Sequence, residues 1–202
     1  RDTYFDNAVM QLAQIGGTGL KLEAVLPAGR HDVLGVMTGD DWITFPAPGG
    51  MTILPGSFAD HMTSYAGVFN NASQTKMSQW IKQGASGTYG TIQEPCPYPS
   101  KFPSAYLHNY YEQGASLAEA LYRSVYAVPF QGFAYGDLLT RAHAALPTVS
   151  VNSLPESVSN NLDIQVTAQA TYAGASVNNI DLYIDGKIVA NRTSSGTFTI
   201  DT

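Results

Sequence analysis

The sequence is poor in charged residues, in cysteine and in long apolar runs, and each shortage excludes a class of protein. Charged residues make up 13% of the 202 positions, against about 25% in an average soluble domain. The net charge of −6 argues against a nucleic-acid partner, because binding a phosphate backbone needs a stripe of Lys and Arg. No apolar run approaches the roughly 18 residues of a membrane span.

Cysteine and cofactor motifs are equally scarce. Cys96 is the single cysteine, so the chain has no internal disulfide, and one thiol cannot build a structural zinc site without three other ligands. The Gly-rich stretch 16–19 follows a predicted helix instead of linking a strand to a helix. It therefore predicts a helix end and not a phosphate loop, and we expect no cofactor.

In place of charge the chain carries many Gly, Ser, Thr, Asn and Tyr residues, a composition that resembles extracellular proteins. Its apolar fraction of 44% is sufficient for real hydrophobic cores. The sequence opens at Arg1 without a signal peptide and stops within a predicted strand, so we interpret it as a fragment or a processed chain. We expect a secreted bacterial protein, extracellular or at the cell surface.

Residues 1–146 alternate helical and extended patterns. Helices are predicted at 3–15, 75–82, 105–112 and 116–127, and strands at 20–25, 33–37, 51–54, 87–93 and 130–135. Pro55-Gly56 is expected to close the third strand, and Ser116 with Glu119 forms a predicted capping box. This alternation predicts an α/β domain: a three-layer, mainly parallel sheet with helices on both faces.

From Pro147 the pattern changes to short alternating strands. Strands are predicted at 162–170, 180–184, 187–189 and 197–200, with Asp185-Gly186 as a hairpin turn. Residues 147–202 therefore predict a β-sandwich domain, but one shorter than the roughly 100 residues that the immunoglobulin fold needs. We expect strands from elsewhere to complete it, which implies a protein partner or self-assembly.

Several motifs in the first domain carry a family resemblance: 54–65 (LPGSFADHMTSY), 74–78, 84–95 and 116–120. Together they resemble an uncharacterised family of predicted secreted bacterial proteins. The region is also similar to the second half of the gingipain-type, caspase-like peptidase fold, here with a strand ending in Gly136-Asp137, and the α/β domain would then be an incomplete copy of that fold. The tail resembles the immunoglobulin-like modules of bacterial surface proteins, through its hairpin at 182–186.

The caspase-like resemblance implies a cysteine peptidase with Cys96 as nucleophile and His61 as its base. Each residue follows a predicted strand, so both could lie at one edge of the sheet. The sequence departs from the family in two ways: His61 precedes Met62 where gingipain-like enzymes have a His-Gly pair, and Cys96 comes one strand late. The competing interpretation of His61 is a structural residue, hydrogen-bonded at a helix start inside the sheet edge.

Two other constellations near His61 have less support. Ser57, Asp60 and His61 could suggest a serine triad, but no G-x-S-x-G motif is present, and neighbours along a chain rarely meet in triad geometry. Asp60 and His61 with Glu94 and Asp137 could gather a cation, but their spacing matches no metal motif. We therefore predict no metal site.

Aromatic residues suggest a role in binding. Tyr98, Phe102, Tyr106 and Tyr110 lie in a Pro-rich loop and the predicted helix after it, a composition typical of glycan or protein surfaces. Half of them could equally belong to the core. We expect a non-catalytic secreted or cell-surface protein that acts in binding or assembly, with a cysteine peptidase and a carbohydrate-binding surface module as the alternatives.

Overall fold

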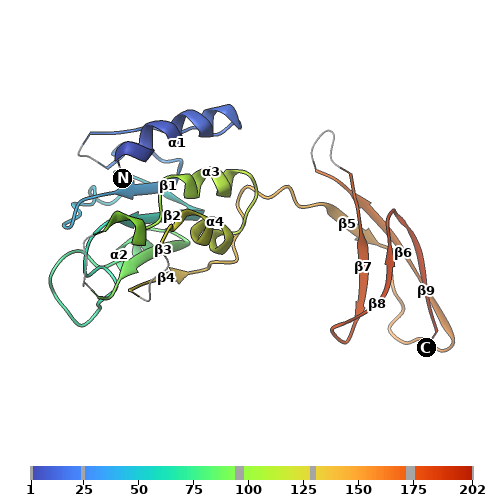
Figure 1. Ribbon diagram of the computed structural model, residues 1–202. Coiled ribbons are helices and arrows are strands. Elements are labelled where there is room, and N and C mark those ends of the chain that lie inside the picture. Colours follow the sequence, from blue (N-terminus) through green and yellow to red (C-terminus); the bar gives the residue numbers. More distant parts are fainter. Residues whose placement is uncertain (1, 24–25, 94–97, 128–130, 172–175, 202) are drawn as a thin grey trace. The chain divides into compact units, whose positions relative to one another are not determined.

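The computed structural model describes residues 2–23, 26–93, 98–127, 131–171 and 176–201 (Figure 1). The chain divides into two compact units, Arg1–Ala144 and Ala145–Thr202. We call them the α/β unit and the two-sheet unit. The division falls close to the boundary at 146/147 that the sequence suggests.

The α/β unit is built on one four-stranded sheet. Its strands are β1 (Val33–Thr38), β2 (Ile53–His61), β3 (Gly87–Thr91) and β4 (Gly132–Gly136), in the spatial order β1-β2-β3-β4. The first three strands are parallel neighbours, and β4 runs antiparallel to β3. The sheet is therefore mixed, with two parallel pairings and one antiparallel.

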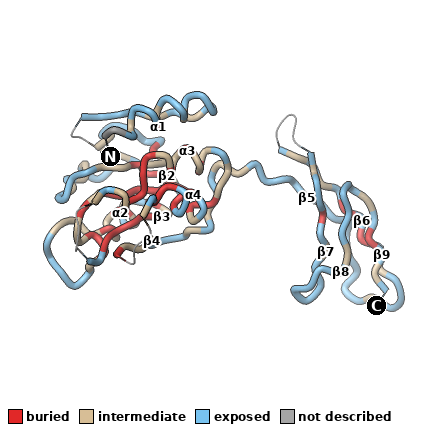
Figure 2. The backbone as a smooth tube through the Cα atoms, in the orientation of Figure 1, coloured by how far each residue is buried: buried red, intermediate tan, exposed pale blue. Residues whose placement is uncertain are grey.

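Helices cover both faces of this sheet. They are α1 (Asp2–Gln14), α2 (Ser78–Lys82), α3 (Tyr106–Glu112) and α4 (Leu117–Ser124), with a short 3-10 turn, η1, at Pro99–Lys101. Neighbouring residues of a strand point to opposite faces: Phe58 packs in the cluster of α3 and α4, and Ala59 packs with Trp80 of α2. Buried residues accordingly concentrate in the sheet and the segments against it (Figure 2). Among the described residues, no helix has the length and apolar character of a membrane span.

β2 is longer than its sequence predicts. Pro55-Gly56 does not end the strand, which continues to His61. The register against β1 shifts here, since Val33 pairs with Ile53 but Gly35 pairs with Phe58. Gly56 makes the irregularity possible with a φ of 91°, and its carbonyl accepts a 2.6 Å hydrogen bond from the Tyr111 hydroxyl. The Pro-Gly pair therefore marks a bulge anchored from α3.

The predicted strand at 20–25 is wrong for residues 20–23, which form no regular structure; residues 24–25 lie outside the described part. Leu20 and Leu22 are 61% and 43% exposed. These two side chains alternate with polar residues, as in a strand, but they do not pack in a core. The predicted helices are present, although α2, α3 and α4 are shorter than expected. The capping box is confirmed: the Glu119 N–H donates to Ser116 Oγ at 3.2 Å, and the Ser116 N–H donates to Glu119 Oε2 at 2.7 Å.

The two-sheet unit contains only antiparallel strands. One sheet has the order β5 (Thr148–Val151), β6 (Asn161–Gln169), β9 (Gly196–Asp201), and the other pairs β7 (Ile180–Ile184) with β8 (Lys187–Arg192). Both sheets contribute to one core, whose buried members are Ile164, Val166, Ile180 and Phe198. The predicted hairpin is confirmed, with positive φ at Asp185 (51°) and Gly186 (75°), as a type I′ turn requires. β5 was not predicted.

Candidate functional site

His61 is the last residue of β2 and is fully buried. Its Nδ1 accepts a hydrogen bond from the Trp80 indole N–H at 2.9 Å, and its Nε2 lies 2.8 Å from the Thr75 carbonyl oxygen. An indole N–H only donates and a carbonyl only accepts, so these partners select the neutral ring with its proton on Nε2. Both ring nitrogens are thus engaged in joining β2 to α2 and the segment before it. His61 does not stand at a helix start.

The proposed nucleophile, Cys96, lies outside the described residues, as does Glu94. His61 ends β2, and β3 is the strand that precedes Cys96 in the sequence; β2 and β3 are parallel neighbours. Their carboxyl ends therefore share one edge of the sheet, as expected. The pairing of Cys96 with His61 stays a prediction.

Ser57, Asp60 and His61 do not meet as a serine triad. Asp60 and His61 are consecutive on β2, so their side chains point to opposite faces of the sheet. His61 faces Trp80 on the α2 side. Asp60 acts on Tyr89, a member of the core beneath α3 and α4: burial raises the pKa of the Tyr89 hydroxyl to about 12, and the charge of Asp60 acts in the same direction. Ser57 lies four residues from His61, about 13 Å along an extended strand.

Within the described ranges, no three His, Cys, Asp or Glu side chains gather as metal ligands. Asp137, a candidate in the sequence, uses Oδ1 to accept the Leu139 backbone N–H at 3.1 Å. It caps a local turn after β4.

No sequence pattern predicts that Lys101 is buried, yet it is only 1% exposed. Its ammonium lies 5.7 Å from the centre of the Tyr98 ring and 5.5 Å from that of Phe102. Its carbonyl oxygen accepts a hydrogen bond from the Tyr89 hydroxyl at 2.9 Å. Such aromatic neighbours help to stabilise a buried cation, and the hydrogen bond from Tyr89 ties η1 to β3.

The predicted aromatic binding residues separate into two groups. Phe102 lies in the core, 6% exposed and edge-on to Tyr89, so it offers no surface to a ligand. Tyr98 is half-buried, with its hydroxyl 3.4 Å from Gln131 Oε1. Tyr106 and Tyr110 are half-buried and lie one turn apart on α3. Of the four predicted binding residues, only Tyr106 and Tyr110 lie on a helix surface, that of α3.

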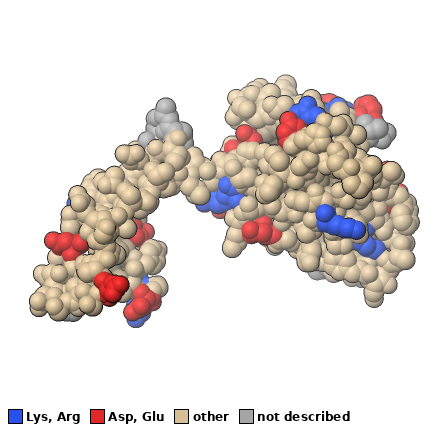
Figure 3. Space-filling view, turned by 180° about the vertical axis from the view of Figure 1, so that it is seen from behind, with Lys and Arg blue, Asp and Glu red and all other residues tan. Residues whose placement is uncertain are grey.

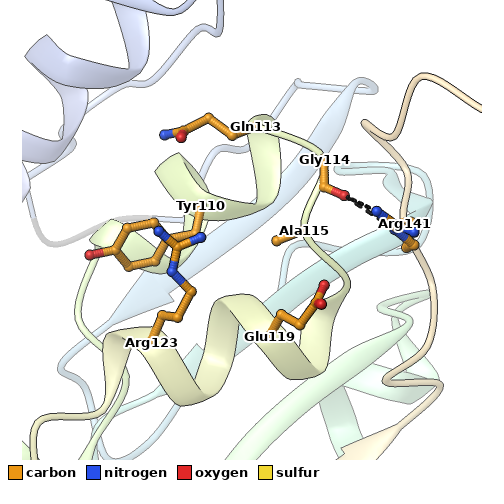
Figure 4. A pocket seen from close by; sticks show the side chains of 7 residues that line it. All are labelled: Tyr110, Gln113, Gly114, Ala115, Glu119, Arg123 and Arg141. Carbon is orange, nitrogen blue, oxygen red and sulfur yellow. Dashed lines mark hydrogen bonds between the residues drawn. The ribbon is translucent and has the colours of Figure 1, made fainter. Parts of the chain in front are cut away.

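A hollow of about 350 Å³ lies where α3 ends and α4 begins (Figure 4). It is lined by Tyr110, Gln113, Gly114, Ala115, Glu119, Arg123 and Arg141. The Arg123 guanidinium lies over the Tyr110 ring, 4.0 Å from its centre. Arg141 donates from Nε and Nη2 to the Gly114 carbonyl oxygen at 3.2 and 2.9 Å.

Glu119 and Arg123 lie four residues apart on α4, a spacing typical of a helical ion pair, but they do not pair. The capping box holds Glu119, and its hydrogen bonds with Ser116 lower the pKa of the carboxyl group, with a smaller effect of Arg141 and Arg123. The Tyr110 ring holds Arg123. Among the described residues Arg123 has neither a hydrogen bond nor an ion pair, so the hollow is lined by two guanidinium groups and one carboxylate, none of which pairs with another.

Comparison of the chain with protein-family models, with curated proteins and with solved structures found no match. The family resemblance of the sequence motifs therefore stays an expectation.

Proposed function

We propose that the chain is a non-catalytic secreted or cell-surface bacterial protein that acts in binding or assembly. In this proposal the α/β unit is a caspase-like, gingipain-like scaffold without a working catalytic pair. The two-sheet unit is an immunoglobulin-like module that docks by accepting further strands. The low charge content supports an extracellular setting, and one face of the molecule carries large areas without charged side chains (Figure 3).

The observation that carries the proposal is the uncovered inner face of β5. Val149 pairs with Ala168 and Val151 pairs with Val166, and residues directly opposed in an antiparallel pair share a face. Ala168 and Val166 belong to the core cluster, yet Val149 and Val151 are 59% and 55% exposed. β5 is also an edge strand. An edge strand whose apolar side chains are exposed pairs readily with another strand. We propose that a second copy of the chain supplies that strand.

Sedimentation of the purified chain tests this. We expect concentration-dependent association at micromolar concentrations. Val149→Lys should weaken it by about tenfold or more, because the ammonium would have to enter the new apolar contact. The matched control is Ser150→Lys, which places the same charge on the opposite face of the same strand and should have a smaller effect. A well-folded monomer at all these concentrations would contradict the proposal.

The second candidate is a cysteine peptidase that uses Cys96 and His61. Against it stands the environment of His61: a fully buried ring would have to give up its bond to Trp80 or to Thr75 before it could take a proton from a thiol.

Labelling of Cys96 distinguishes the two. A thiol-directed peptidase inhibitor should react with the native chain at pH 7 no faster than with the urea-unfolded chain, because an unactivated thiol is mostly protonated at that pH. The single cysteine makes the stoichiometry unambiguous. Labelling of the native chain about tenfold or more faster, and lost in a His61→Gln variant that stays folded, would favour the peptidase.

A further inference from the structure

One arginine that lines the hollow between α3 and α4, Arg123, is exposed and contacts the ring of Tyr110. Stacking on Tyr110 holds the Arg123 guanidinium in place, and within the described part of the chain none of its N–H donors is engaged. A guanidinium ordered in advance loses less entropy when it binds. Its planar fork matches the two oxygens of a carboxylate. Arg123 is therefore suited to a carboxylate ligand.

The opposite side of the hollow presents hydrogen-bond acceptors. Glu119 uses Oε2 for its cap, and its carboxylate also lines the hollow (Figure 4). Gln113, just after α3, lines another part of the hollow with an amide that both donates and accepts (Figure 4). A phosphate or sulfate group would bring additional negative charge towards Glu119. Neutral hydroxyl groups, which donate as well as accept, suit this side better.

The spacing of these groups favours a sugar acid over an amino acid. One helical turn separates Glu119 from Arg123, about 5–6 Å between their Cβ atoms. The Tyr110 ring holds the Arg123 guanidinium apart from Glu119 (Figure 4), so a ligand that reaches both groups must carry its carboxylate and its hydroxyl groups apart. A hexuronic acid has them at opposite ends of one ring, whereas an amino acid carries its two charged groups on one carbon. A hollow of about 350 Å³ is at the small end of ligand pockets and has room for one sugar ring.

We propose that this hollow binds a hexuronic acid residue of an acidic glycan. Arg123 holds the carboxylate, and Glu119 and Gln113 take the hydroxyl groups. The proposal concerns the α/β unit alone and does not depend on strand addition at β5.

Titration of the full chain with D-glucuronate, followed by NMR of backbone amides, tests the site. We expect saturable shifts confined to α3, α4 and the turn between them, with a Kd of about 1 mM, as for a small ligand with few contacts. D-glucose lacks the carboxylate, and acetate and glycine lack the sugar ring. Each should bind at least about tenfold more weakly, because each loses one set of charged hydrogen bonds.

Two arginine variants give the matched comparison. Arg123→Gln should weaken glucuronate binding about tenfold or more. Arg30→Gln removes the same charge from another exposed arginine of the α/β unit, one that pairs with Asp32 at 2.9 Å, and should leave binding unchanged.

Four results would overturn the proposal. Equal affinity for glucose and glucuronate would exclude a role for the carboxylate. Equal or tighter binding of glycine or acetate would exclude the sugar. An equal loss in both arginine variants, or no saturation by about 100 mM glucuronate, a hundred times the expected Kd, would show that the hollow is not a specific site.

Discussion

The Trp80→Ala variant is expected to lower the free energy of unfolding of the α/β unit by about 3–5 kcal/mol. Trp80 is fully buried among apolar residues of β1 and β2 and lies edge-on to Phe45, with ring centres 5.0 Å apart. The substitution leaves a large cavity and removes the only indole that donates to His61 Nδ1. Natural domains are stable by about 5–15 kcal/mol, so the loss is a large part of the total.

Two further variants separate the hydrogen bond from the packing. Trp80→Phe keeps most of the apolar contact but leaves His61 Nδ1 without its indole donor, and should cost about 1–3 kcal/mol. Trp42 is the only other tryptophan and is 58% exposed, so Trp42→Ala should change stability by less than about 0.5 kcal/mol.

Urea unfolding followed by the helical circular dichroism signal measures these effects, because all the helices described lie in the α/β unit. Equal effects of Trp80→Ala and Trp42→Ala would contradict the described core and the structural role of His61.

Prediction from sequence located some elements of the fold and missed others. Apolar periodicity located most strands and helices of the α/β unit, because these faces are buried in the final fold. The extent of β2 could not be predicted, because Pro55-Gly56 is a turn signal that tertiary contacts from Ser86 and Tyr111 convert into a bulge. The exposed alternation at Leu20 and Leu22 predicted a strand for which no neighbour exists among the described residues. Antiparallel placement of β4 likewise depends on long-range pairing that no local pattern encodes.

The candidate site was predicted in part. His61 does lie at the carboxyl edge of the sheet, but its partners, Trp80 and Thr75, come from a segment whose packing against β2 has no local signal. The hollow at α3 and α4 was missed because the spacing of Glu119 and Arg123 indicates an ordinary helical ion pair. A ring on another helix, Tyr110, draws Arg123 away from that pair.

The two-sheet unit should respond even more sharply to a single core substitution. Phe198 is 4% exposed and pairs with Ile164 across β6 and β9, in the core that both sheets share. Phe198→Ala should cost about 3–5 kcal/mol. A small domain buries a small fraction of its surface and has a correspondingly small reserve of stability. We therefore expect this variant to unfold the two-sheet unit while the α/β unit stays folded.

Amide NMR spectra report on both units at once. In Phe198→Ala, the signals of β5 to β9 should collapse into the narrow range of an unfolded chain, and those of the α/β unit should keep their positions. Thr197→Ala is the matched control: Thr197 precedes Phe198 on β9, is exposed, and points to the opposite face, so its loss should leave both sets of signals intact. Loss of the α/β signals together with those of the two-sheet unit would mean that the chain folds as one cooperative body. Retention of the β5 to β9 signals would mean that Phe198 is not central to the shared core.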